Sequence, residues 1–177
     1  MTVYAALLRG VNVGGVKLGM SDLRRVAAAA GCVEPRTFIQ SGNLVFSTAR
    51  RDAEKVGGEL RSALKAELGL DIAVIMRTKA ELAAAIDANP FLKAGGNPAS
   101  QSVAFFADDV DPALLADIDL TKYEPEAARV HKREVYFNLP KGTGHSPMLK
   151  DIGRRKGLTI GTMRNWRTTL AVLAMMD

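Results

Sequence analysis

Residues 36–46 read Arg-Thr-Phe-Ile-Gln-Ser-Gly-Asn-Leu-Val-Phe, two β-prone runs joined by Ser41-Gly42-Asn43. Glycine and asparagine suit tight turns because both tolerate backbone angles that other residues avoid. The stretch therefore predicts a β-hairpin or a bulged strand pair. This hairpin decides the fold, since the segments on either side of it have the pattern of helices.

Moving outward from the hairpin in either direction along the chain, we expect first a helix and then a strand. The earlier helix covers Asp22–Ala30 with Ser21 as its expected N-cap, and the later helix covers Asp52–Leu68. The later helix has apolar residues at every fourth position, namely Val56, Leu60, Leu64 and Leu68. Strands are expected at Val3–Leu8 and Ile72–Met76. The order β-α-β-β-α-β is that of ferredoxin-like folds.

The second half of the chain repeats most of this order. A helix at Lys79–Asp87 leads into residues 89–98, where turn-forming residues crowd together as in a linker. The elements expected after it, in order, are a strand, a helix, two strands and a helix at Ser102–Phe106, Pro112–Asp117, Ala128–Val130, Glu134–Asn138 and Ser146–Lys156. A C-terminal helix, Met163–Met176, is expected in place of the last strand. We therefore predict an α+β protein of two ferredoxin-like (split β-α-β) halves packed together, residues 1–88 and 99–177.

The composition is that of an ordinary globular protein of 177 residues. The single cysteine, Cys32, excludes an internal disulfide and favours a reducing compartment. The first residues lack the pattern of a signal peptide, and no apolar run reaches the roughly 18 residues that a membrane helix needs. We expect a cytoplasmic protein with no membrane association, either a monomer or a homodimer.

The charge is distributed unevenly around a net value of +5. Residues 108–126 hold seven acids and one base, whereas residues 129–167 hold ten bases and two acids. Such asymmetry is typical of surfaces that face a polyanion. The alternative is that the two stretches face each other or are simply solvated.

A glycine-rich segment follows the first strand: Arg9-Gly10-Val11-Asn12-Val13-Gly14-Gly15-Val16-Lys17. Glycine allows backbone N–H groups to approach a ligand closely, and Arg9, Asn12 and Lys17 add donors that suit an anion. Gly10, Gly14 and Gly15 are therefore ligand-binding candidates. The segment is not a nucleoside-triphosphate loop, because Val16 stands where that motif requires lysine. The alternative is a tight structural connection.

The hairpin turn is a second candidate segment, with Ser41, Gly42 and Asn43 as ligand-binding candidates. A serine nucleophile needs a positioned base, and His131 and His145 lie far along the chain without a motif around them. Two histidines and one cysteine without ligand spacing give no metal site, and no cofactor is expected.

The third candidate segment runs from Thr162 to Thr168. If Thr162 caps the C-terminal helix, Arg164, Asn165 and Thr168 fall in its first turns. Arginine is unfavourable at the positive end of a helix unless an anion binds there. The alternative is that Arg164 pairs with the acidic stretch. Trp166 is expected in the core with one edge at a cleft, and it completes the set of ligand-binding candidates.

Taken together, the motifs resemble the bacterial family called domain of unknown function 1697. The segments that carry the resemblance are Leu7–Gly15, Met20 with Leu23-Arg24, Thr37–Phe46, Asn89-Pro90-Phe91 and Thr162–Thr168. The resemblance implies a compact α+β protein with two ferredoxin-like halves, and it implies no activity. Family members often have tyrosine where Phe38 stands here.

Our leading hypothesis is a binding protein for nucleic acid or a nucleotide-like phosphate. Arg9, Lys17, Arg164 and the loop amides would hold phosphate, and asparagine side chains would orient it: Asn12, Asn43 and Asn165. Two alternatives stay open: an enzyme acting on a small phosphorylated or carboxylated metabolite, and a protein–protein interaction module.

Overall fold

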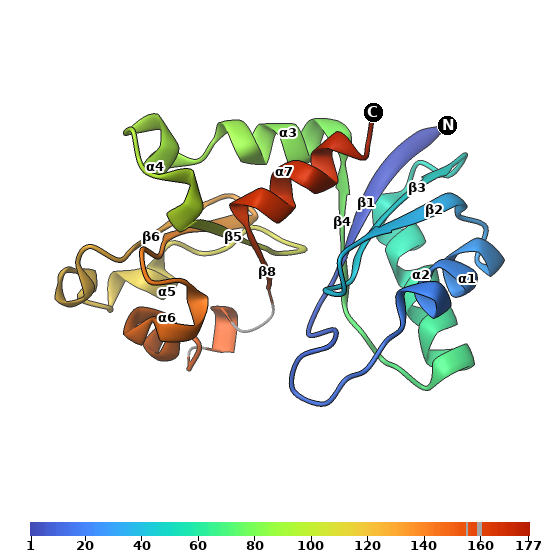
Figure 1. The fold of residues 1–177 in the computed structure, drawn as a ribbon, viewed down its shortest axis with the longest axis horizontal. Coiled ribbons are helices and arrows are strands. Elements are labelled where there is room, and N and C mark those ends of the chain that lie inside the picture. Colours follow the sequence, from blue (N-terminus) through green and yellow to red (C-terminus); the bar gives the residue numbers. More distant parts are fainter. Residues whose placement is uncertain (155, 159–160) are drawn as a thin grey trace. The chain divides into compact units, whose positions relative to one another are not determined.

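The computed structural model describes residues 1–154, 156–158 and 161–177 (Figure 1). The chain forms two compact units. The first unit is Met1–Ala84 together with Leu170–Asp177, and the second is Ala85–Thr169. The last eight residues thus belong to the first unit, whereas the sequence places them with the second half.

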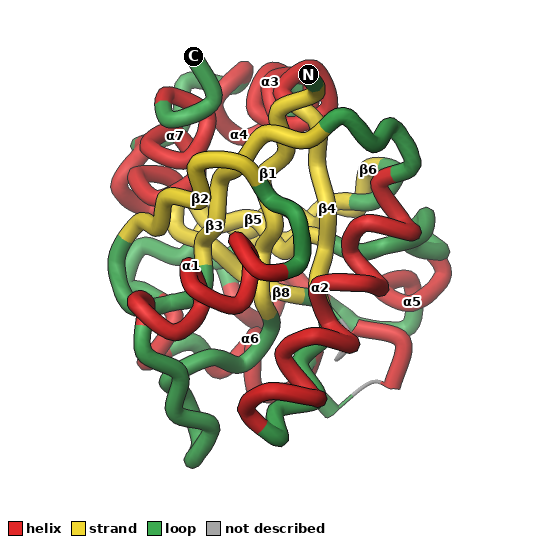
Figure 2. Tube along the Cα trace, turned by 90° about the vertical axis from the view of Figure 1, so that its right-hand side faces the viewer, coloured by secondary structure: helices red, strands yellow, loops and turns green. Residues whose placement is uncertain are grey.

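The first unit contains a four-stranded antiparallel sheet with the strand order β2-β3-β1-β4. Its elements are β1 (Thr2–Leu8), α1 (Met20–Ala29), β2 (Val33–Phe38), β3 (Asn43–Thr48), α2 (Ala53–Leu68) and β4 (Val74–Thr78). Both helices lie on the same face of the sheet (Figure 2). The expected hairpin is confirmed as β2 and β3, which pair through Phe38 and Asn43.

The core of the first unit lies between that sheet face and the two helices. Alternate residues of β1 point toward it, namely Tyr4, Ala6 and Leu8. The predicted apolar face of α2 supplies Val56, Leu60 and Leu64 to the same core.

Short-range chemistry sets the ends of the helices. The Asp52 side chain accepts a hydrogen bond from the Lys55 N–H and caps α2, and Gly69 ends this helix with a left-handed φ of 69°. In α1 the N-cap is Gly19 and not Ser21, so the expected side-chain cap is wrong.

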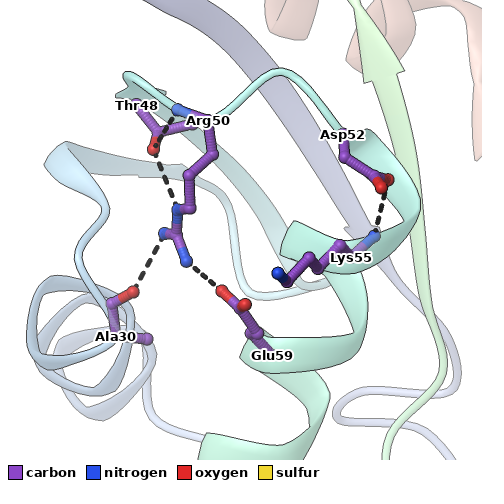
Figure 3. A network of polar contacts seen from close by, with 6 residues as sticks. All are labelled: Ala30, Thr48, Arg50, Asp52, Lys55 and Glu59. Carbon is purple, nitrogen blue, oxygen red and sulfur yellow. Dashed lines mark hydrogen bonds and ion pairs between the residues drawn. The ribbon is translucent and has the colours of Figure 1, made fainter.

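Arg50 ties three elements of this unit together (Figure 3). Its guanidinium donates to the Thr48 hydroxyl at 3.2 Å and to the Ala30 carbonyl at 3.0 Å, and it forms an ion pair with Glu59. These contacts join the end of β3, the end of α1 and the middle of α2.

The second unit has the same strand order, β6-β7-β5-β8, again antiparallel. Its elements are β5 (Gln101–Phe105), α5 (Ala113–Ala116), β6 (Ala127–His131), β7 (Glu134–Asn138), α6 (Pro147–Ile152) and β8 (Thr162–Asn165). Helices α3 (Lys79–Asp87) and α4 (Pro90–Lys93) connect the two sheets, and α7 (Trp166–Ala174) follows β8. Short 3₁₀ turns cover Pro98–Ser100, Leu120–Tyr123, Thr143–His145 and Lys156–Leu158. The α+β class and the two ferredoxin-like halves are confirmed.

The expected helix start at Met163 is wrong, because Thr162–Asn165 forms strand β8. Met163 and Arg164 lie opposite Ala104 and Val103 of β5, so the second unit has the complete β-α-β-β-α-β order. Helix α6 ends at Ile152, well before the expected Lys156. Arg155, which the sequence places in that helix, lies outside the described residues.

The core of the second unit lies on one face of its sheet. Phe106 and Phe137 on the sheet side pack in one cluster with Met148 and Ile152 of α6. Among the described residues, no helix has the length and apolar character needed to cross a bilayer.

Candidate functional site

We call residues Arg9–Lys17 the glycine loop, and one side chain holds its shape. The Asn12 amide donates to the carbonyl oxygens of Leu18, at 3.0 Å, and Gln40, at 2.5 Å. The Asn12 side-chain oxygen accepts from the Leu18 N–H at 3.0 Å. Asn12 itself has a left-handed φ of 57°, a conformation that asparagine tolerates. All hydrogen-bonding groups of this amide are therefore used in fixing the loop.

The backbone N–H groups at the tip of the glycine loop form no hydrogen bond with the described residues. The Asn12 N–H donates to the Val16 carbonyl at 2.8 Å, which closes the loop around Val13-Gly14-Gly15. Among the described residues, none accepts a hydrogen bond from the N–H groups of these three residues. All three are exposed, and a Cβ added at Gly14 or Gly15 would meet nothing within 4 Å. The tip is an open set of N–H donors.

Two cations flank these donors in the sequence. Arg9 and Lys17 are both exposed, and within the described part of the chain neither side chain forms a hydrogen bond or an ion pair. Arg9 is anchored through its backbone, whose N–H donates to the Ala73 carbonyl at 3.0 Å. Exposed N–H groups and unpaired cations within one loop attract an anion.

The hairpin turn contacts the glycine loop within the first unit. The Gly42 carbonyl accepts from the Leu8 N–H at 2.9 Å, and the Gln40 carbonyl accepts from Asn12. Gly42 is buried with a φ of 74°, and a Cβ there would lie 2.8 Å from the Leu8 Cβ. Asn43 is only 1% exposed and donates to the Phe38 carbonyl and the Ser41 hydroxyl. The turn therefore supports the glycine loop through hydrogen bonds, and Gly42 and Asn43 have structural roles in the turn.

The third candidate segment lies in the second unit, where the structure gives its residues different settings from those expected. Arg164 is on strand β8, 7% exposed, and donates to the Thr162 hydroxyl and the Met163 carbonyl, both at 2.8 Å. Burial lowers its pKa to about 10, so it stays protonated at neutral pH. The expectation that Arg164 occupies a helix start is wrong. Its binding of a ligand stays a prediction.

Asn165 begins the helix that Thr162 was expected to cap. Its side-chain oxygen accepts from the Thr168 N–H at 2.8 Å, three residues into α7. Trp166 and Thr168 are buried, at 4% and 3% exposed, in agreement with a core position for the indole. Ligand binding by Asn165, Trp166 and Thr168 also stays a prediction.

Sequence reasoning missed Arg77, which is the counterpart of Arg164 in the first unit. Arg77 of β4 lies opposite Ala5 of β1, just as Arg164 of β8 lies opposite Val103 of β5. Each guanidinium donates a hydrogen bond to the carbonyl oxygen of the preceding residue at 2.8 Å. Arg77 is fully buried. An internal repeat in the sequence could have found it.

The repeat is Met76-Arg77-Thr78 against Met163-Arg164-Asn165. In each case the third residue ends a strand and caps a following helix of nine residues, α3 or α7. Thr78 exchanges hydrogen bonds with Glu81, forming a capping box. The two halves therefore repeat a strand, a buried arginine, a cap and a helix.

The oppositely charged stretches of the sequence both belong to the second unit. Two of their ion pairs join residues three apart: Lys122 with Asp119 at 3.9 Å, and Arg154 with Asp151 at 3.2 Å. Exposed pairs of this kind contribute at most about 1 kcal/mol.

Comparisons with known proteins agree with this fold. The family model described as "Protein of unknown function (DUF1697)" matches residues 1–136. A conserved bacterial protein from Streptococcus pneumoniae has a similar structure, with a TM-score of 0.74, 19% sequence identity and 99% of each chain covered. At this identity the likeness shows the fold alone. No curated protein matches the chain.

Proposed function

The chain belongs to the family of proteins of unknown function called DUF1697, and we propose that it binds nucleic acid through phosphate contacts at the glycine loop. One observation carries this proposal: Asn12 fixes the loop so that the N–H groups of Val13, Gly14 and Gly15 stay exposed and unbonded within the described structure. Arg9 and Lys17, which flank these residues in the sequence, add unpaired positive charge.

The openness of the loop favours a polymer over a small metabolite. The glycines have no neighbour within 4 Å of an added Cβ, so no wall closes over a ligand bound there. Small-molecule sites usually bury most of the ligand surface. A phosphate backbone, in contrast, needs only a cationic surface and a few donors. The net charge of +5 supports association with a polyanion.

The test is the salt dependence of oligonucleotide binding by a charge-matched pair of variants. Fluorescence anisotropy of labelled single-stranded and duplex DNA would give affinities over a series of salt concentrations. We expect Lys17→Met to reduce the log–log slope by about 0.9 on duplex DNA, which is the contribution of one neutralised phosphate. The control is Lys55→Met, which removes the same charge from the exposed side of α2 in the same unit.

The outcomes separate the three hypotheses. Equal slopes for Lys17→Met and Lys55→Met mean that binding is diffuse and not at the loop. Binding of mononucleotides or sugar phosphates without binding of oligonucleotides supports the metabolite enzyme. Absence of binding to all of these ligands at low salt refutes the proposal and leaves the protein–protein interaction module. The exposed side chains of Val13 and Ile39 would suit such a module, because exposed apolar side chains can contact a partner protein.

A further inference from the structure

A cavity in the second unit, which we call the proline cavity, has a volume of about 390 Å³. Three prolines form apolar walls, Pro125, Pro140 and Pro147. Tyr123 and polar or charged side chains, including the exposed Glu124, complete the lining. The volume is at the small end of the range for ligand pockets, roughly 300–1,000 Å³. The cavity is lined by residues of the second unit, whereas the glycine loop belongs to the first unit.

The buried charged residue of this lining is Glu126, which is 7% exposed. One carboxylate oxygen, Oε2, accepts from the Ser146 hydroxyl at 2.8 Å and from the Met148 N–H at 3.3 Å. Within the described structure no group donates to the other oxygen, Oε1. Oε1 is not among the fully buried atoms, so a ligand can reach it. A carboxylate in a largely buried residue is stabilised by a positively charged donor, and the cavity therefore offers a place for an ammonium group.

Two lysine ammonium groups supply the opposite charge at the same cavity, and a histidine adds a further polar group. Lys122, Lys141 and His145 line it and are exposed. The only ion pair that engages one of them in the described residues is Lys122 with Asp119, at 3.9 Å and with both side chains more than half exposed. Such a pair is weak, so these groups are available to a carboxylate.

Hydrogen bonds hold the side of the cavity that Pro125 and Glu126 form. The Asn138 amide donates to the Pro125 carbonyl at 2.9 Å, and Gln101 in turn donates to the Asn138 side-chain oxygen at 2.9 Å. The Glu126 N–H donates to the Tyr123 carbonyl at 2.8 Å. Rigid walls reduce the entropy lost on binding.

We propose that the proline cavity binds a small zwitterion, with its ammonium group on Glu126, its carboxylate among Lys122, Lys141 and His145, and its apolar part against the prolines. A free α-amino acid with an aliphatic side chain has this chemistry. The proposal does not depend on nucleic-acid binding, and its test uses a different unit of the protein.

The test is NMR titration of the full ¹⁵N-labelled chain with three ligands that share one branched four-carbon unit. L-valine carries both charges, 3-methylbutanoate lacks the ammonium group, and 2-methylpropan-1-amine lacks the carboxylate. We expect L-valine to shift the amide signals of residues 122–126 and 141–148 saturably, and each analogue to bind at least about tenfold more weakly, as the loss of one charged hydrogen bond predicts. Equal binding of all three ligands, or no saturable shift with L-valine, overturns the proposal.

Two variants assign the charges. Glu126→Gln keeps an oxygen for Ser146 and Met148, and we expect L-valine then to bind no better than 3-methylbutanoate. Lys141→Met should weaken L-valine binding, whereas Lys150→Met, which removes an exposed charge of the same unit outside the cavity lining, should not. Equal effects of the two lysine variants would also overturn the proposal. Thermal unfolding of each variant separates loss of the ligand contact from loss of the fold.

Discussion

Replacing Gly42 by alanine should destabilise the first unit, and the structure provides the matched control. Gly42 and Gly14 have similar left-handed φ angles, 74° and 64°. A side chain in this conformation costs about 1–2 kcal/mol, and both alanine variants carry that cost. The two sites differ in space, because an added Cβ at Gly42 would lie 2.8 Å from the Leu8 Cβ and 3.1 Å from a Val11 methyl group, whereas Gly14 has nothing within 4 Å.

The difference between the two variants therefore measures the steric term alone. Forcing an extra methyl group into a packed core typically costs about 1–3 kcal/mol. We expect Gly42→Ala to lose about 2–5 kcal/mol in total and Gly14→Ala about 1–2 kcal/mol. Both glycines come from segments that the sequence marks as ligand-binding, but only Gly42 is required by packing.

Urea unfolding followed by far-UV circular dichroism would measure both changes. With a slope of about 1–3 kcal/mol per molar urea, the Gly42 variant should unfold roughly 1 M earlier than the Gly14 variant. Amide exchange at Leu8, whose N–H bonds the Gly42 carbonyl, would place the loss in the first unit. Equal midpoints for the two variants would refute the packing of Gly42 against Leu8 and Val11.

Three further outcomes are expected. Asn12→Gly keeps the left-handed backbone but removes three side-chain hydrogen bonds, so the Leu18 amide should exchange faster and stability should fall by about 1–3 kcal/mol; an unchanged Leu18 amide would contradict the clamp. Arg50→Met keeps the aliphatic stem but should lower the free energy of unfolding by about 1–3 kcal/mol, seen as a lower urea midpoint, because it removes the bonds to Thr48, Ala30 and Glu59. Cys32 is 5% exposed and burial raises its pKa from 9.0 to about 11. The thiol of the native protein should therefore react with a disulfide reagent at pH 8 far more slowly than the thiol of the unfolded protein, and rapid labelling of the native protein would contradict the burial. Because the folded state keeps the thiol proton to a higher pH than the unfolded state does, the free energy of unfolding should fall as the pH rises from about 9 to about 11.

Local chemistry explains the elements that the sequence predicts well. The hairpin at Ser41-Gly42-Asn43 and the helix between Asp52 and Gly69 both contain their own start and stop signals, a turn glycine in one and caps in the other. These signals act over a few residues and do not depend on distant partners.

Strand β8 could not be recognised in the same way, because pairing with β5 creates it. Thr162–Asn165 has only four residues, directly before a helix, and in the sequence it is continuous with that helix. Its strand conformation is fixed by hydrogen bonding beside Val103, sixty-one positions before Arg164. Tertiary pairing of this kind overrides local propensity. The repeat of Met-Arg-polar at Met76 and Met163 was the signal that could have revealed it.

The structure also divides the candidate site residues by whether their polar groups are already used. The side-chain amide of Asn12 forms hydrogen bonds that shape the glycine loop. The amide of Asn43 forms a hydrogen bond within the hairpin turn, and the side-chain oxygen of Asn165 caps the start of α7. Substituting any of them changes the fold locally, so lost binding would not identify a ligand contact. Lys17 makes no hydrogen bond or ion pair among the described residues, and its removal changes charge without removing a bond. A change in salt dependence for Lys17→Met with unchanged thermal unfolding would therefore report contact with the anion, and the same change together with earlier unfolding would mean that the loop had lost its shape.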